Sequence, residues 1–309
     1  MFNYTTCLIA AALVALLAQQ ASANVYAPRV DVAQWKVEAS PFICKMTQTI
    51  PNYGEGVFER RAGKTVGFYL HSGQEYMSAG KAMVEAQAPL WQPNRDARSL
   101  GYVSVVRKEQ PINLDETLAL AMLDELHRGM MLDFKRESFY RKDVYSKDET
   151  VRVGLSPVNF QVAYHAYTDC LAQLLPVNFD QIERTSVYFE TADQDMTDDS
   201  RIRLDHIVAY LKADPTVGAM FVDGHADNRG DREKNLVLSK ARAERVTNYL
   251  ILAGIAPDRL TTRYHGERYP IASNGTAKGR AKNRRVTIRI ERAASLGLLG
   301  GGAEATPDF

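Results

Sequence analysis

A polar loop and the helix after it hold the residues whose types and spacing best suggest chemistry. The loop, Asp223–Gly230, reads DGHADNRG and contains Asp227, and the helical stretch that follows contains Arg242. Leu238 and Val246 stand four residues before and after Arg242, so this arginine falls on the apolar stripe of its own helix. A guanidinium held there, near a helix start that favours anions, suits bidentate binding of a carboxylate.

Asp227 lies in the loop that leads to this helix, where its carboxylate could bind an ammonium group of the same ligand. Asp227 and Arg242 together therefore predict a ligand with a carboxylate and an amine close together, such as the end of an amino acid. A structural ion pair between Asp227 and Arg242 without any ligand is the alternative at this stage, because structural pairs resemble binding sites.

The region that must position these residues alternates between strand and helix patterns from Val177 onward. Strands are predicted at 185–189, 217–222, 261–264 and 286–290, and helices at 198–213 and 236–253. Thr197 can cap the first helix, and Gly254 can end the second. Residues 177–293 are therefore predicted to form a compact α/β sandwich, with a mixed sheet and helices on one face. A flexible, glycine-containing tail, 294–309, is expected after it.

Residues 24–176 are predicted to form a separate β-rich domain with minor helices. Segments 56–61 and 64–70 have strand character and flank Ala62-Gly63, a plausible hairpin turn. Apolar residues recur at helical spacing over 115–128 and 160–174. The two regions together predict an α+β protein of two domains.

The amino terminus predicts an export signal. Its apolar run, LIAAALVALLA at 8–18, is shorter than the roughly 20 residues that a transmembrane helix needs. Ala21-Ser22-Ala23 follows, and this small-x-small pattern is typical of signal-peptidase cleavage. We expect residues 1–23 to be a signal peptide and the mature, exported chain to begin at Asn24.

The cysteines fit an exported protein. Cys7 falls within the signal peptide, which leaves Cys44 and Cys170 as the thiols of the exported chain. In an oxidising compartment such a pair is most simply a disulfide, although two unrelated buried thiols are the alternative.

The charge balance indicates no attraction of the whole protein to nucleic acid. Among the 309 residues, 38 Lys and Arg face 37 Asp and Glu, which gives a formal net charge of +1. A basic run does occupy 278–292, but it lacks the interleaved aromatic residues that stack on bases. We therefore expect no nucleic-acid partner.

The motifs around Asp227 and Arg242 resemble those of the OmpA-like peptidoglycan-binding domain. The order GHAD..G....N..LS..RA..V is followed by Gly279-Arg280 and by Asn283-Arg284-Arg285-Val286, and the resemblance covers roughly 185–292. In that family the motif Asp and Arg hold the diaminopimelate of the peptide stem. Asp227 and Arg242 occupy those positions, and Asn235 matches the motif Asn that helps to shape the pocket.

The same resemblance implies a supporting role for other residues of these motifs. His225 and Asn228 in the loop, together with Arg284 and Arg285, are expected to shape or brace the pocket. Ala226 stands where the family commonly has Thr, so one hydrogen bond to the ligand is expected to be missing.

The first domain resembles a narrower group, the MotY-like periplasmic proteins of flagellar motors. The resemblance rests on GEGVFERRAG (54–63) and PLWQP (89–93), on domain order and chain length, and on the export signal and cysteine pair. It implies a non-enzymatic component of a periplasmic ring, without a cofactor, that helps to recruit or anchor stator units. The first domain would join the basal body and a MotX-like protein, while the second grips peptidoglycan.

Two other functions remain open from sequence. A general peptidoglycan-anchored envelope protein without a motor role would share the same second domain. A metal-dependent peptidoglycan hydrolase would need His225 and Asp227, with His206 or His265, as zinc ligands, since zinc takes three or four. The chain has no HExxH, GxSxG or P-loop motif, so we expect neither a metal site nor a catalytic one.

Overall fold

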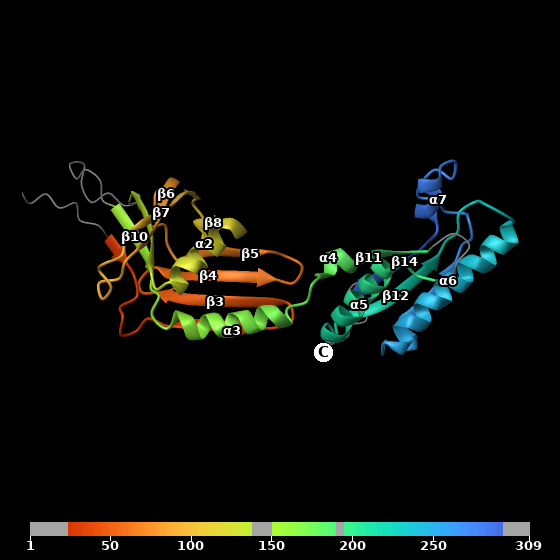
Figure 1. Cartoon of the computed structure of the whole chain (residues 1–309), viewed down its shortest axis with the longest axis horizontal. Coiled ribbons are helices and arrows are strands. Elements are labelled where there is room, and N and C mark those ends of the chain that lie inside the picture. The colour runs from red at the N-terminus through yellow and green to blue at the C-terminus, as the bar shows by residue number, and fades with distance from the viewer. Residues whose placement is uncertain (1–23, 138–149, 190–194, 293–309) are drawn as a thin grey trace, which may run out of the picture. The chain divides into compact units, whose positions relative to one another are not determined.

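A computed structural model describes residues 24–137, 150–189 and 195–292 of the chain (Figure 1). The predicted signal peptide, 1–23, and the predicted tail, 294–309, lie outside the described residues. The chain forms two compact units, and the change between them falls between Gln173 and Leu174, with residues 62–64 grouped in the second unit. Among the described residues, no helix is both long and apolar enough to span a membrane.

The described residues of the first unit form mainly strands, with two helices. Its elements are β1 (Asn24–Tyr26), β2 (Trp35–Ala39), β3 (Ile43–Ile50), β4 (Gly54–Arg61), β5 (Val66–Ser72), β6 (Gly80–Gln87), β7 (Arg98–Val105), β8 (Ile112–Leu114), α2 (Glu116–His127), β9 (Met131–Glu137), β10 (Thr150–Leu155) and α3 (Phe160–Gln173). They build two five-stranded sheets, in the orders β1-β10-β9-β6-β7 and β2-β3-β4-β5-β8. The prediction of a β-rich first domain is confirmed.

Alternating burial along the strands explains why the two sheets pack together. Every second residue of β5 is buried, as expected for a strand with one face on a core. Phe68 on β5 stacks on Phe134 on β9, with ring centroids 5.6 Å apart, so the two sheets share an apolar core. The predicted hairpin is also present: β4 pairs antiparallel with β5, and Gly63 in the turn has φ of 65°, a conformation that glycine adopts without strain.

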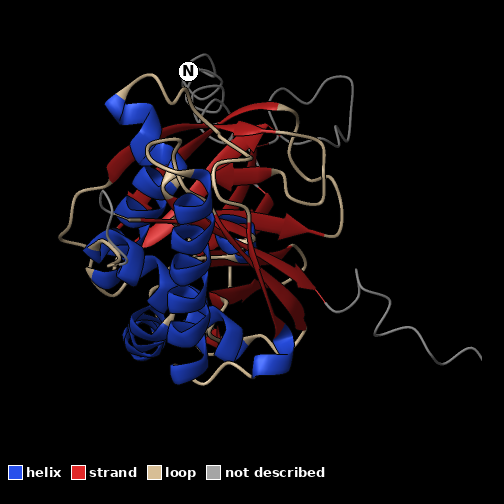
Figure 2. Ribbon diagram, turned by 90° about the vertical axis from the view of Figure 1, so that its right-hand side faces the viewer, coloured by secondary structure: helices blue, strands red, loops and turns tan. Residues whose placement is uncertain are grey.

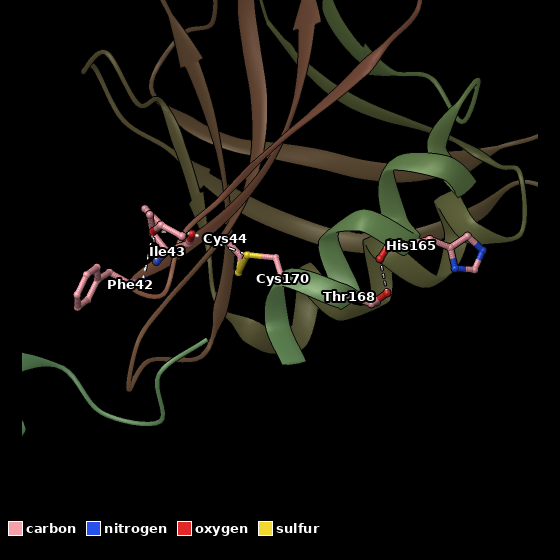
Figure 3. Close-up of a disulfide and its surroundings, with 7 residues drawn as sticks. Phe42, Ile43, Cys44, His165, Thr168 and Cys170 are labelled. Atoms are coloured by element: carbon pink, nitrogen blue, oxygen red, sulfur yellow. Dashed lines mark hydrogen bonds between the residues drawn. A yellow bond between two sulfur atoms is a disulfide. The ribbon is translucent and has the colours of Figure 1, made fainter. Parts of the chain in front are cut away.

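A disulfide joins the sheet that contains β3 to helix α3. Cys44 on β3 is bonded to Cys170 on α3, with Cα atoms 5.9 Å apart (Figure 3). Both residues are buried. The predicted disulfide is therefore present, and it ties together two parts of the chain 126 residues apart in sequence.

The second unit is a four-stranded mixed sheet with helices. Its elements are α4 (Phe179–Ile182), β11 (Arg184–Tyr188), α5 (Asp198–Ala213), β12 (Val217–Gly224), α6 (Arg232–Leu252), the 3₁₀ helix η1 (Pro257–Arg259), β13 (Leu260–Tyr264), α7 (Ala277–Asn283) and β14 (Arg285–Arg292). The strand order is β11-β14-β12-β13, with β12 and β13 parallel and the other neighbours antiparallel. Helix α5 packs on β11, and α6 packs on the three other strands (Figure 1). Figure 2 shows the helices in blue and the strands in red, after a turn of 90° about the vertical axis.

Most predicted elements of the second unit are present, with differences at their ends. Thr197 caps α5 by accepting a hydrogen bond from the Ser200 N–H, as predicted. Helix α6 begins four residues earlier than expected, because Asp231 caps it and accepts from the N–H groups of Glu233 and Lys234. Helix α7 was not predicted, because its sequence AKGRAKN has no apolar periodicity.

Candidate functional site

A cavity of about 340 Å³ opens where the β12–α6 loop, the first half of α6 and helix α7 meet. Its lining residues are Ala226, Asp227, Arg229, Asn235, Leu238, Arg242, Ala277, Arg280 and Arg284. The cavity therefore brings together the three residues predicted to bind the ligand, Asp227, Asn235 and Arg242. One of the predicted pocket-shaping residues, Arg284, joins them.

Asp227 is fixed in the cavity wall by two contacts. One carboxylate oxygen, Oδ1, accepts the backbone N–H of Arg229 at 2.9 Å, and Oδ2 accepts from Arg284 Nη1 at 3.1 Å. The side chains of Asp227 and Arg284 are about one-tenth exposed, so this ion pair is shielded from solvent. Asp227 thus forms an ion pair with Arg284, one of the residues predicted to shape the pocket.

Arg242 lies on the buried stripe of α6, as the sequence pattern predicted. It has no exposed surface, and Ser239, Ala243 and Val246 on the same stripe are also buried. Its guanidinium lies over the ring of Phe189, 5.2 Å from the ring centroid, which is a favourable cation–π arrangement. A buried guanidinium at a cavity wall is well placed to bind a carboxylate, because the low local dielectric strengthens the attraction.

Asn235 connects α6 to the loop after β13. The side chain is buried, and Nδ2 donates to Glu267 Oε2 at 2.8 Å. A second link joins the same loop to the cavity wall, because the Ala226 N–H donates to the Gly266 carbonyl at 2.8 Å. These two hydrogen bonds hold the wall of the cavity on one side.

On the other side, Asn283 organises the loop before α7. It has no exposed surface and accepts from the N–H groups of Ile271 and Ala272, at 2.9 and 3.1 Å. Its Nδ2 donates to the Ala272 carbonyl and to Asn274 Oδ1, both at 2.8 Å. The Asn283 side chain thus holds the loop that precedes α7, and α7 carries two residues of the cavity lining.

The other predicted pocket-shaping residues lie outside the lining. His225 and Arg285 are buried behind the wall, and Arg285 Nη2 donates to the Tyr269 carbonyl at 3.2 Å. Asn228 is exposed, because the hydrogen bond from the Arg229 N–H to Asp227 makes Asn228 the tip of a tight turn. The sequence analysis did not select Arg229, Arg280 or Ala277, since placing the last two depended on the unpredicted helix α7.

The histidines considered as zinc ligands form different contacts. The rings of His225 and His265 are stacked with centroids 5.1 Å apart, and His265 Nε2 lies 3.0 Å from Asp223 Oδ1. His206 belongs to α5. No group of three His, Cys, Asp or Glu side chains is arranged to hold a metal ion in the part of the chain that the structure describes.

The buried His225 makes the stability of the second unit depend on pH. Burial, followed by the positive charges of Arg285 and His265, lowers the pKa of His225 to about 4, although Asp223 acts in the opposite direction. Between about pH 6.5 and pH 4 the unfolded chain therefore binds more protons at this position than the folded chain does.

We expect the free energy of unfolding of the second unit to fall as the pH is lowered through this range, by about 3 kcal/mol from His225. Urea unfolding followed by circular dichroism at several pH values measures the slope. His225→Gln should flatten it, whereas His206→Gln, at a half-buried position on α5, should leave it as it is. An equal slope in wild type and His225→Gln would show that other groups dominate.

Gly224 lets α6 approach the sheet closely just before the cavity loop. A Cβ atom at this position would collide with the Ser239 carbonyl oxygen on α6 and lie 3.1 Å from the Ala243 Cβ. Gly224→Ala should therefore displace α6 and lower the free energy of unfolding by about 1–3 kcal/mol or more. Gly230→Ala is the comparison variant, because nothing lies within 4 Å of a Cβ atom at that position. It tests backbone strain without a collision, since Gly230 has a φ of 90°. If Gly224→Ala unfolds at the same urea concentration as wild type, the close approach is not required.

Comparison with known proteins finds a family match for each of the two units. Residues 26–176 match the MotY N-terminal domain, and residues 188–284 match the OmpA family. The sodium-type flagellar protein MotY of Vibrio parahaemolyticus is 30% identical over 270 residues, which cover 86% of this chain and 90% of that protein. The peptidoglycan-associated lipoprotein of Pseudomonas putida is 35% identical over 105 residues, 34% of this chain and 62% of that protein.

Two solved structures that are similar to this chain each cover about a third of it. The peptidoglycan-associated lipoprotein of Burkholderia pseudomallei shares 30% identity, covers 34% of this chain and is covered over 89% of its own length, with a TM-score of 0.33. The C-terminal domain of Helicobacter pylori MotB shares 27% identity over 36% of this chain and 87% of that domain, also with a TM-score of 0.33.

The two units and the family matches define a two-domain protein whose second unit carries a domain of the OmpA family. The match of residues 26–176 to the MotY N-terminal domain identifies the family of the whole chain. The chain belongs to the MotY family of flagellar motor proteins.

Proposed function

We propose that this protein is a non-catalytic, periplasmic part of the flagellar motor ring, which binds peptidoglycan through residues 177–293 and helps to recruit or anchor the stator units. The observation that carries the proposal is the cavity in which the Asp227 carboxylate and the buried Arg242 guanidinium both take part. An amino acid end offers an ammonium group to the first and a carboxylate to the second. The diaminopimelate of the peptide stem has such an end.

The remaining residues support this binding mode. Asp227 and Arg242 both line the cavity, and Asn235 and Asn283 fix neighbouring loops by hydrogen bonds. A site held in place before the ligand arrives loses less conformational entropy on binding. In this proposal residues 24–176 join the basal body and a MotX-like protein, so that the stator is braced against a wall that does not rotate.

The experiment that tests the motor role is swimming in a strain that lacks this gene, with flagellar filaments checked by electron microscopy. Filaments on paralysed or slow cells would support the proposal. Normal swimming would contradict the motor role and favour a general wall-anchored envelope protein. The muropeptide profile of purified sacculi, measured with and without the added protein, provides the check on catalysis: released fragments would contradict the non-catalytic role.

A further inference from the structure

The loop that follows β13 exposes three successive apolar side chains. Tyr269 is 58% exposed, Ile271 is 56% exposed, and Pro270 between them is also exposed. Single exposed apolar residues are common on protein surfaces, whereas a contiguous group of them favours contact with another molecule. This group, called the 269–271 patch, is not among the described residues that line the cavity.

Hydrogen bonds on both sides of the patch fix its place beside the cavity. Asn235, which lines the cavity, donates to Glu267 Oε2 at 2.8 Å, and Glu267 stands two residues before Tyr269. Since a residue spans at most about 3.6 Å, the Cα atoms of Glu267 and Tyr269 lie within about 7 Å of each other. On the other side, the Ile271 N–H donates to Asn283 Oδ1 at 2.9 Å. The 269–271 patch therefore borders the cavity wall.

The Tyr269 ring is held in one orientation although most of it is exposed. Its centroid lies 5.2 Å from that of the His265 ring and 6.4 Å from that of the buried His225 ring, and both pairs are nearly perpendicular. The Tyr269 carbonyl accepts from Arg285 Nη2 at 3.2 Å. A ring that is already oriented loses little conformational entropy when a ligand packs on it.

The groups around this ring suit a sugar. A pyranose ring has a face of C–H groups, which packs on an aromatic ring, and a rim of hydroxyl groups, which needs hydrogen-bonding partners. Tyr269 offers the aromatic ring. Arg268 and Glu267, the two residues before it, are exposed and half-buried, respectively, and their side chains can bond to hydroxyl groups.

The covalent structure of peptidoglycan places a sugar near the patch. Diaminopimelate is the third residue of the stem, and the first residue is joined to the N-acetylmuramic acid of the glycan strand. Two residues therefore separate the group in the cavity from the sugar, a reach of about 10 Å at most. With the stem in the cavity, the glycan strand has to pass along the rim, and the 269–271 patch forms part of that rim.

We propose that the 269–271 patch is a glycan-binding surface, on which the Tyr269 ring packs against an N-acetylated sugar of the strand that carries the bound stem. The domain would then recognise the glycan strand as well as the peptide. This inference rests on the proposed function, since it takes the stem to occupy the cavity.

Two soluble ligands separate the sugar contact from the peptide contact. The first is the alanyl-γ-glutamyl-diaminopimelate tripeptide with its amino terminus acetylated, and the second is the same tripeptide joined to the N-acetylglucosamine–N-acetylmuramic acid disaccharide. Neither has a free amino terminus, so they differ only in the sugars. Isothermal titration calorimetry with the full mature chain measures both affinities. We expect the disaccharide form to bind at least about fivefold more tightly.

Variants of Tyr269 assign this gain to the patch. In Tyr269→Ala the two ligands should bind with affinities within about twofold of each other, and the affinity for the tripeptide should stay that of wild type. The backbone carbonyl that accepts from Arg285 is kept in this variant. Tyr269→Phe retains the aromatic ring and should retain the gain from the sugars.

Leu252→Ala is the matched control, because it removes an apolar side chain that is 88% exposed on the same unit. Leu252 is the last residue of α6, about 25 Å along the helix from Asn235, so the gain from the sugars should persist. Circular dichroism confirms that all three variants are folded.

The possible outcomes separate the inference from the proposed function. Equal affinities of the two ligands for wild type, or a gain from the sugars that persists in Tyr269→Ala, would overturn the inference and leave stem binding in place. If neither ligand binds to wild type, the proposed function of the cavity fails, and the inference fails with it.

Discussion

Asp227→Asn should lower the affinity of the protein for purified peptidoglycan at least about tenfold, the largest effect expected from a single change that preserves volume. The amide retains an oxygen that accepts the Arg229 N–H but has no charge for the ligand ammonium or for Arg284. A hydrogen bond to a charged group contributes about 1.5–3 kcal/mol, and 1.4 kcal/mol corresponds to a factor of ten. The loss also leaves Arg284, which is mostly buried, without its ion-pair partner.

The measurement is the fraction of protein that sediments with sacculi over a range of sacculus concentrations. Asp258→Asn serves as the control, because Asp258 is an exposed carboxylate on η1 in the same unit and does not line the cavity. Circular dichroism before and after heating shows whether Asp227→Asn remains folded. A folded Asp227→Asn protein that sediments as well as wild type would mean that the wall binds elsewhere.

Removal of the disulfide should produce the largest change in stability. Without the Cys44–Cys170 bond, the unfolded first unit gains the freedom of a loop of 126 residues, which costs about 5 kcal/mol of stability on the chain-entropy model. The double variant Cys44→Ala/Cys170→Ala also loses packing at two buried positions. Folded domains are stable by only about 5–15 kcal/mol. The double variant should therefore lose a large part of the free energy of unfolding of the first unit.

Tryptophan fluorescence isolates this effect. The chain has two tryptophans, Trp35 and Trp91, and both belong to the first unit, so urea unfolding followed at their emission reports on that unit alone. Wild type treated with a reducing agent should approach the stability of the double variant. A double variant that unfolds at the urea concentration of oxidised wild type would show that the bond adds nothing to stability.

Local patterns allowed the elements of the second unit and the β-rich character of the first unit to be predicted. Helices with a clear apolar stripe, such as α5, and strands with alternating burial, such as β11, were found to within a few residues. Their boundaries followed from capping residues, Thr197 being the clearest case. Helix α7 could not be found this way, because seven residues without apolar periodicity carry no signal beyond a capping Thr276.

The candidate site was predicted in part for the same reason. Arg242 could be found because an arginine on an apolar stripe conflicts with its surroundings, and such a conflict indicates a special role. The pairing of Asp227 with Arg284 joins residues 57 positions apart, and it depends on how β14 and the β12–α6 loop meet. Local spacing contains no information about such a contact. Arg280 lines the cavity because helix α7 places it there, so it was missed together with that helix.

The central claim is that the cavity between α6 and α7 binds the peptide stem of the wall. The most direct test is sedimentation of the full mature chain with purified sacculi, with and without an excess of the free diaminopimelate tripeptide. We predict that the protein sediments with the sacculi and that the tripeptide releases it into the supernatant. Protein that stays in the supernatant throughout, or that sediments equally well in the presence of the tripeptide, would contradict this account.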